Sequence, residues 1–229
     1  MDIVEAINKR KSIRAFKPDP VPQKILKEII ELALRAPSWG NTQPWELAVV
    51  TGPKLEEIKR AFVARVDDAH QPDVTAPLQF PDPYGSRRRT LGIKIFEIEG
   101  IKRDDKEKRR EWQQRGLRLF DAPCAVYVYT DRSFYSQGNG VNVWSVFDCG
   151  LVLENIMLLV AAYGLGTIPE IQSVAFPDIL KKVLGISDSK LIVLGMAIGY
   201  PDWDHPLNKF HSEREPMDKV AKWYGFTEK

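Results

Sequence analysis

The longest apolar segment, Val146 to Tyr163, constrains the fold of this chain more than any other feature. Its length approaches the roughly 20 residues that a helix needs to cross a bilayer. Asp148, Glu154 and Asn155 interrupt it, and ionisable groups inside a membrane cost several kcal/mol each. We therefore interpret the segment as the central buried helix of a soluble protein. A chain of 229 residues can bury such a helix within one domain, residues 1–229.

Charge and cysteine content disfavour several functional classes. The net charge is only +2, so no overall basic field predicts a nucleic-acid or membrane partner. The local basic excess at residues 102–118 is typical of a solvated helix face. Cys124 and Cys149 lie in apolar segments and the first residues do not resemble a signal peptide, which predicts a cytoplasmic protein. The three histidines are scattered, so we expect no metal site.

Hydrophobic periodicity predicts an α+β fold, because helices alternate with about four strands and no βαβ unit repeats. Asp2 and Glu5 indicate a capped first helix, and Pro37 must end the second. Gly164 and Gly166 suit C-terminal caps of the central helix. The expected helices cover about 3–10, 22–36, 55–62, a charged stretch up to about 120, 145–163, 176–184 and 216–223, and the expected strands cover 45–50, 124–130 and 191–198.

Residues 67 to 90 contain four prolines and Gly85, too many breakers for long regular structure. A connection of this length is usually functional or disordered. Phe80, Tyr84 and Arg88, with Arg87 and Arg89, combine stacking surface with cations that could hold a substrate carboxylate. The alternative is a solvated loop.

Two segments near the N-terminus carry chemistry suited to a phosphorylated heteroaromatic ring. If residues 10–14 run extended, Arg10, Ser12 and Arg14 face one way and Ile13 faces the core, which would direct two guanidinium groups and a hydroxyl at one anion. The loop Ala36 to Trp45 offers Asn41 and Gln43, whose amides could match the donor and acceptor edge of such a ring. These amides could equally bond only to the loop itself.

The order of these motifs resembles the nitroreductase family of FMN-dependent oxidoreductases. The resemblance rests on the R-x-S-x-R segment, the loop A-P-S-x-x-N-x-Q-P-W, a late G-L-G-T-x-P-E at Gly164 to Glu170, and the segment Phe210 to Pro216. It covers the chain except for a variable substrate-side insertion at about residues 67–112. It implies a central, mostly antiparallel sheet flanked by helices, assembled as an intertwined homodimer with FMN at the subunit interface.

The resemblance also implies which residues contact the cofactor. Backbone groups near Glu170 and Ile171 would lie against flavin N5 and O4. Arg118 aligns with a basic residue near N1 and O2, although it could be one more charge on its helix, and Arg214 would supply a third cation for the phosphate. The full set is Arg10, Lys11, Ser12, Arg14, Pro37, Ser38, Trp39, Asn41, Gln43, Arg118, Pro169, Glu170, Ile171 and Arg214.

The expected activity is hydride transfer from NADH or NADPH through flavin N5 to a planar aromatic or conjugated acceptor, a nitroarene or a quinone, by ping-pong exchange. No protein group is expected to act as nucleophile or base, since the cofactor carries the chemistry. Alternatives on the same scaffold are reductive dehalogenation, enoate reduction, and flavin or ring dehydrogenation. A different alternative is a flavin-binding redox module without turnover.

Overall fold

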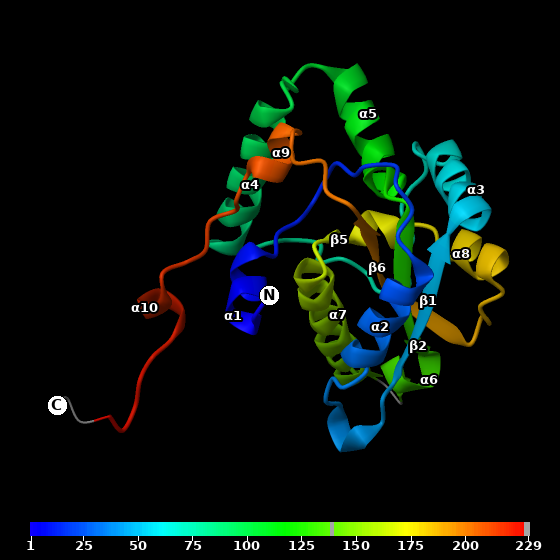
Figure 1. Ribbon diagram of the computed structural model, residues 1–229, viewed down its shortest axis with the longest axis vertical. Helices are drawn as coiled ribbons and strands as arrows, with labels where there is room; N and C mark the ends of the chain where they lie inside the picture. Colours follow the sequence, from blue (N-terminus) through cyan, green and yellow to red (C-terminus); the bar gives the residue numbers. More distant parts are fainter. Residues whose placement is uncertain (138–139, 227–229) are drawn as a thin grey trace.

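A computed structural model describes residues 1–137 and 140–226. Its centre is a sheet in the order β1-β2-β6-β5, and every neighbouring pair is antiparallel (Figure 1). This confirms the predicted α+β class with a mostly antiparallel sheet. The strands are β1 (Trp45–Thr51), β2 (Cys124–Asp131), β5 (Gly166–Glu170) and β6 (Lys190–Gly199), and a small separate hairpin is formed by β3 (Ser136–Gln137) and β4 (Gly140–Val141).

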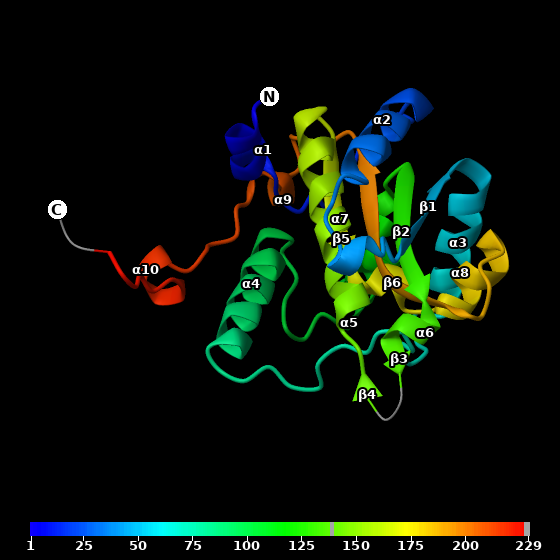
Figure 2. The same ribbon diagram turned by 90° about the horizontal axis from the view of Figure 1, so that it is seen from below.

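Helices cover both faces of this sheet (Figure 2). On one face lie α2 (Gln23–Ala33) and α7 (Trp144–Ala162), and on the other lie α3 (Gly52–Ala64) and α8 (Pro177–Leu184). Strand β2 serves both layers, because Cys124, Val126 and Val128 pack with α7 while Ala125 and Tyr127 pack with α3 and α8. All five residues are fully buried. Because both faces of β2 are covered by helices, its sequence is a continuous apolar run.

Helix α7 is the predicted central helix, and it is long and apolar enough, by length and composition alone, to cross a membrane. One side packs on the sheet, where Cys149, Val152 and Ile156 are fully buried. The opposite side leaves Trp144 and Phe147 more than half exposed. The apolar surface of α7 therefore exceeds what this chain covers.

The remaining helical elements lie at the chain ends and between the elements of the two layers. Asp2 caps the first helix as predicted, because its Oδ1 accepts a hydrogen bond of 2.8 Å from the Glu5 N–H. The elements are α1 (Ile3–Lys9), α4 (Tyr84–Ile98), α5 (Lys106–Leu117), α6 (Arg132–Tyr135), α9 (Pro206–Lys209), α10 (Met217–Val220), and the short 3₁₀ turns η1 (Trp39–Asn41), η2 (Leu119–Asp121) and η3 (Ile171–Val174).

Two local predictions were wrong. The irregular segment expected to reach residue 90 ends earlier, because α4 begins at Tyr84 directly after its last proline. Gly166 is not a helix cap but the first residue of β5, and Gly164, with φ +75°, alone provides the left-handed turn after α7. A strand as short as β5 has little periodicity of its own, and its pairing with β6 defines it.

Asp73 anchors the long connection between α3 and α4 to the strand β6. Its carboxylate accepts hydrogen bonds from the Ile192 N–H at 2.9 Å and from Arg132 Nη2 at 2.8 Å, and it lies 3.2 Å from Lys181 Nζ. These partners hold the pKa of Asp73 below its usual value against the opposing effect of burial.

We expect Asp73→Asn to lower the free energy of unfolding by about 2 to 3 kcal/mol at neutral pH, because it weakens hydrogen bonds to a charged group. Since the folded-state pKa is depressed, this contribution is present above the unfolded-state pKa and disappears as the pH falls through the folded-state value. Urea titrations between pH 3 and 7 should show the two proteins converging at low pH. The exposed Asp178→Asn is the control, expected to change stability by about 1 kcal/mol or less.

Candidate functional site

The R-x-S-x-R segment lies beside β5. Ser12 forms an isolated parallel bridge with Thr167, and the Ile13 N–H donates to the Thr167 carbonyl at 3.1 Å. Ile13 is buried, as the alternation of an extended segment predicts. Because the two segments run parallel, Arg10 lies near the start of β5 and Arg14 near its end.

Arg10 and Lys11 line a pocket of about 450 Å³ between the end of α1, the start of β5 and the segment after α9. Lys11 Nζ lies 3.0 Å from His211 Nε2 and 5.1 Å from the centre of the Trp203 ring. Burial lowers the pKa of Lys11. Thr167 also lines this pocket, and its enclosed Oγ1 has no hydrogen-bond partner among the described residues. The pocket therefore combines cations with an unused hydroxyl, a donor set that suits a phosphate.

Arg14 and Ser12 are not among the residues that line this pocket. The backbone N–H of Arg14 donates to Asn208 Oδ1 at 2.8 Å, and its carbonyl accepts from Arg115 Nη2 at 3.3 Å. Its guanidinium is largely enclosed near Glu170, and burial lowers its pKa. Four extended residues span about 13 Å, so the backbone of Arg10 and the backbone of Arg14 lie about that far apart along β5. Arg14 thus lies outside the pocket that Arg10 and Lys11 line in one chain, and the convergence of the two arginines on one anion stays a prediction.

Gly166 allows the close approach of the R-x-S-x-R segment to β5. A Cβ at this position would lie 2.6 Å from Ile13 Cγ1 and 2.8 Å from Pro201 Cγ. We expect Gly166→Ala to destabilise the fold by about 1 to 3 kcal/mol through overpacking and to displace residues 10–14. Gly92→Ala in α4, where no atom lies within 4 Å of the added carbon, should be neutral or slightly stabilising. Equal thermal shifts for both variants would contradict this assignment.

The loop Pro37 to Trp45 contains three residues with left-handed backbone conformation. Gly40, Asn41 and Gln43 have φ values of +57°, +56° and +47°. Ser38 Oγ accepts from the Gln43 N–H at 2.9 Å, and the buried Asp148 accepts from the Trp39 N–H at 3.1 Å through Oδ2. Non-glycine residues held at positive φ carry strain that recurs at ligand-binding sites.

The two side-chain amides of this loop bond to each other, because Gln43 Nε2 donates a hydrogen bond of 3.3 Å to Asn41 Oδ1. The loop borders a second pocket of about 520 Å³, which Pro37, Ser38 and Trp39 share with Trp144 and Phe147. The rings of Trp39 and Trp144 lie 5.9 Å apart.

The two pockets lie at opposite ends of α7. Trp144 in its first turn lines the loop pocket, whereas Ala161 in its last turn lines the cationic pocket. Seventeen helical residues span about 26 Å, which exceeds the length of one mononucleotide. Within one chain, the two halves of the predicted site are therefore separated.

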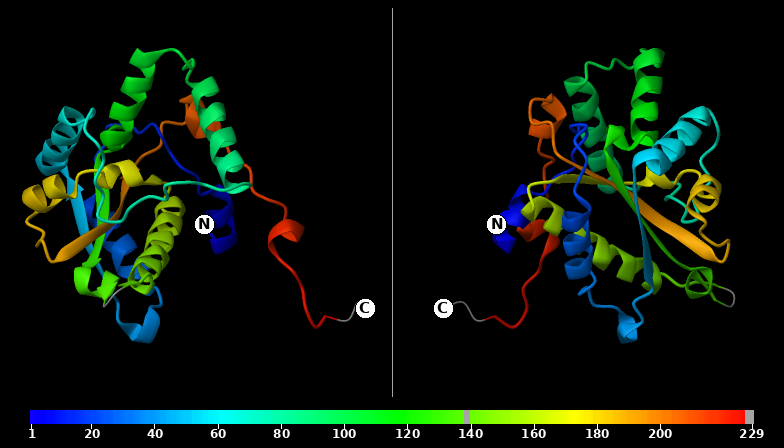
Figure 3. Two further views of the ribbon diagram at one scale, coloured as in Figure 1. Left: turned by 180° about the vertical axis from the view of Figure 1, so that it is seen from behind. Right: turned by 45° about the vertical axis from the view of Figure 1, so that its right-hand side comes forward.

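The other predicted cofactor residues have the following positions. Arg118 is the C-cap of α5 and pairs with Asp121 at 3.0 Å. Arg214 bonds locally to Ser212 Oγ at 2.7 Å, on a C-terminal segment that extends away from the body (Figure 3). Pro169 and Glu170 end β5, and the exposed Ile171 begins η3.

Sequence reasoning missed two residues that organise the site. The buried Asn208 donates through Nδ2 to the carbonyls of Ala15 at 2.7 Å and Asp202 at 2.8 Å, and it accepts from the Arg14 N–H. His211 completes the cationic pocket beside Lys11. Asn208 gives little local signal in the sequence, because two of its three partners, Arg14 and Ala15, are about 190 residues away.

The predicted substrate residues surround the start of α4. The Arg88 guanidinium lies 5.2 Å from the centre of the Phe80 ring. Arg87 stacks on Tyr84 at 5.4 Å and pairs with Glu215 at 2.9 Å, while Arg89 pairs with Asp82 at 3.3 Å. Arg88 is the member of this cluster without a carboxylate partner among residues 1–137 and 140–226.

Comparison with known proteins defines the class to which this sheet and its two pockets belong. The sequence model of the nitroreductase family matches residues 7–200. The chain belongs to the nitroreductase family. It is 31% identical over 98% of its length to 96% of a 4-nitrobenzoate reductase from Pseudomonas putida, and 31% identical over 96% of its length to 95% of a chloronitrobenzene nitroreductase from Comamonas testosteroni.

A solved structure extends the likeness to the whole fold. The FMN and NADPH-dependent nitroreductase NfnB from Sphigopyxis sp. strain HMH superposes with a TM-score of 0.91 at 33% identity, covering 99% of this chain and all of that one. The α+β architecture and the assignment from four short motifs are therefore confirmed.

Proposed function

We propose that this protein is an FMN-dependent oxidoreductase that passes reducing equivalents from NADH or NADPH to a planar aromatic acceptor, a nitroarene or a quinone. The observation that carries the proposal is the cationic pocket at Arg10, Lys11 and His211, beside the strand β5. The relatives named for nitrobenzoate and chloronitrobenzene support a nitroaromatic acceptor, and NfnB supports NADPH as a donor.

FMN fits the residues that are present. Its phosphate carries close to two negative charges, which Arg10, Lys11 and the unpartnered Thr167 hydroxyl would hold. Arg14, without a hydrogen-bond or ion-pair partner for its guanidinium among the described residues, would face the other end of the cofactor. When bound, FMN supplies a hydride acceptor and donor, and the protein supplies position, charge and exclusion of water.

The second half of the site would come from a second copy of the chain. The loop at Ser38 and Asn41 and the cationic pocket lie at opposite ends of α7. Two chains packed with their α7 helices antiparallel would bring the loop of one next to the pocket of the other. Each FMN would then lie at the subunit interface, and the homodimer would contain two complete sites.

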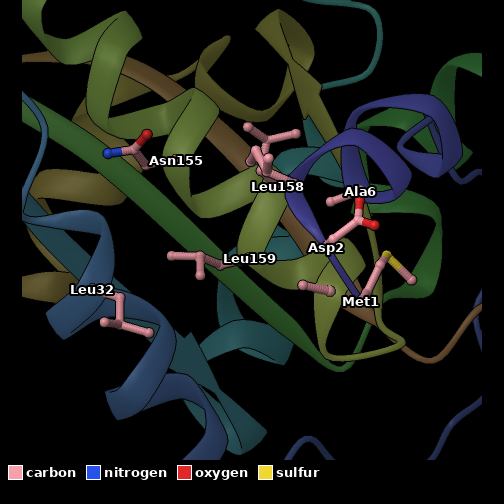
Figure 4. A pocket seen from close by; sticks show the side chains of 9 residues that line it. Met1, Asp2, Ala6, Leu32, Asn155, Leu158 and Leu159 are labelled. Atoms are coloured by element: carbon pink, nitrogen blue, oxygen red, sulfur yellow. The ribbon is translucent and has the colours of Figure 1, made fainter.

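Exposed apolar surface along α7 supports this homodimer. A pocket of about 360 Å³ opens between α1, α2 and α7, where Met1, Leu32, Leu158 and Leu159 lie around a shared hollow (Figure 4). It continues the exposed apolar side of α7 at Trp144 and Phe147. Exposed apolar surface of this extent marks an interaction site in soluble proteins.

The C-terminal segment supports an intertwined arrangement. After Glu215, which still pairs with Arg87 of α4, the chain leaves the body, and α10 stands apart from the sheet and its helices in Figures 1 and 2. Trp223, Tyr224 and Phe226 on this segment are at least 65% exposed. Three aromatic side chains in water favour a docking site on the partner subunit, to which the segment would also bring Arg214.

Arg88 would select among acceptors. Its guanidinium is stacked on Phe80 and free of carboxylates among the described residues, so it could bind the carboxylate of an aromatic acid. A cytoplasmic location fits the two buried free thiols, Cys124 and Cys149.

Anaerobic titration tests the proposal directly. The purified protein should be yellow, and NADPH or NADH should bleach its flavin absorbance. Steady-state oxidation of the nicotinamide should then depend on an added nitroarene such as 4-nitrobenzoate, or on a quinone. Failure of both nicotinamides to bleach the bound flavin would contradict a nicotinamide-driven reductase, and bleaching without acceptor-dependent turnover would indicate a binding module.

A further inference from the structure

Glu170 is a buried carboxyl group that the proposed reaction does not use. Its Oε2 is enclosed and has no hydrogen-bond partner within residues 1–137 and 140–226. Its own carbonyl accepts a hydrogen bond of 2.5 Å from Ser173 Oγ, which fixes the backbone at the end of β5. A buried carboxyl oxygen without a hydrogen-bond partner lowers the stability of the folded state, and such groups are rare in native proteins.

Three segments enclose this carboxyl group. The helix α5 closes over it at Gly116, where a Cβ would lie 3.2 Å from Glu170 Oε1 and 1.8 Å from Gln172 Oε1. Gln172 in η3 is neutral. Arg14 on the N-terminal segment is the one charged group among the described residues that acts appreciably on Glu170. Arg115, next to Gly116, bonds to the Arg14 carbonyl and is paired with Glu99, so it contributes little net charge.

Enclosure governs the charge of the pair. Burial raises the pKa of Glu170 to about 8, although the nearby Arg14 guanidinium opposes this rise. No ion pair within 4.0 Å joins the two side chains in the described part of the chain. At neutral pH the carboxyl group is therefore mostly protonated, and Arg14 keeps a positive charge that no ion pair among residues 1–137 and 140–226 balances.

We propose that Glu170 is a positioning residue that controls the charge available at Arg14 through its own proton. With the carboxyl group protonated, the guanidinium is free to hold an anionic part of the cofactor. With it ionised, Glu170 neutralises Arg14 and weakens that contact. The inference rests on the proposed function, because the anion is part of bound FMN in its oxidised or reduced form.

The proton balance follows from linkage. A negative charge placed beside Arg14 disfavours a second negative charge on Glu170, so binding shifts the carboxylate toward its acid form by taking one proton from solvent. Near the pKa, where about half of the groups are ionised, a complete shift corresponds to uptake of roughly half a proton per site.

The experiment measures proton uptake when flavin binds to the apoprotein at pH 8. Calorimetry in two buffers of different ionisation enthalpy gives the number of protons, with oxidised FMN and with anaerobically reduced FMN. The FMN phosphate is already fully ionised at pH 8, since its second pKa is about 6. We expect the wild type to take up several tenths of a proton more than Glu170→Gln, which keeps the shape of the side chain, for at least one redox form. The comparison removes any uptake at Lys11 in the phosphate pocket, which both proteins share.

A second variant separates charge from structure. In Arg14→Gln the opposing cation is gone, so Glu170 should stay protonated at pH 8 and the uptake should fall to that of Glu170→Gln. Equal uptake in the wild type and Glu170→Gln, or no uptake by the wild type with either form of FMN, would overturn the inference. Absence of FMN binding in every protein would instead contradict the proposed function.

Stability of the apoprotein tests the carboxyl group without any flavin. Because the folded-state pKa is raised above the unfolded value of about 4.5, the folded state binds more protons, and stability falls as the pH rises through this window. The melting temperature of Glu170→Gln should gain on that of the wild type between pH 5 and 8, and the difference should level off above pH 8. A pH-independent difference would show that Glu170 is not a buried acid.

Discussion

Replacing Arg10 by alanine is expected to raise the dissociation constant of FMN about 10- to 100-fold, because a charge-assisted hydrogen bond contributes roughly 1.5 to 3 kcal/mol. Arg10 and Lys11 line the cationic pocket near the start of β5, which we assign to the phosphate. Riboflavin lacks this phosphate, so its affinity should be nearly unchanged. Quenching of flavin fluorescence by the apoprotein measures both constants.

Arg14→Ala provides the contrast to Arg10→Ala. Because Arg14 lies at the other end of β5, near Glu170, its loss should weaken riboflavin as well as FMN. The matched control is Arg88→Ala, which removes an arginine that stacks on Phe80, away from both pockets. It should retain the flavin and change only acceptor kinetics. Loss of riboflavin affinity in Arg10→Ala, or unchanged FMN affinity in both Arg10→Ala and Arg14→Ala, would contradict the assignment of the two ends.

Removing the aromatic side chains of the C-terminal segment should convert the proposed dimer to monomers and release FMN. The variant replaces Trp223, Tyr224 and Phe226 with alanine. Burying one large apolar side chain is worth about 1.5 to 3 kcal/mol. The proposed dimer would contain two such segments, so even one buried ring in each gives roughly 3 to 6 kcal/mol, and its loss should raise the dimer dissociation constant about 100- to 10⁴-fold.

Sedimentation velocity over a range of protein concentrations, with absorbance of the bound flavin recorded in the same cell, measures both effects. Lys222→Ala lies in the same exposed segment and is the matched control, expected to behave as wild type. A triple variant that remains dimeric and yellow at nanomolar concentration would mean that the segment does not dock on the partner.

The fold class was predictable because it depends on local patterns. The apolar run at α7, the two-faced strand β2 and the capped helix α1 each carry their own periodicity or end signal, and all three have the predicted form. Family membership followed from short motifs in a fixed order. Each of these features depends on residues that are close together in the sequence.

The arrangement of the site depended on contacts between distant segments, for which the sequence carries no local signal. Asn208 holds Arg14 from the far end of the chain, and Gly166 belongs to a strand because β6 lies beside it. The separation of the loop and the cationic pocket by the length of α7 follows only from packing both on one helix. Likewise, the enclosure of Glu170 depends on Gly116 closing over it, because tertiary packing, not residue type, decides which polar groups lose their water.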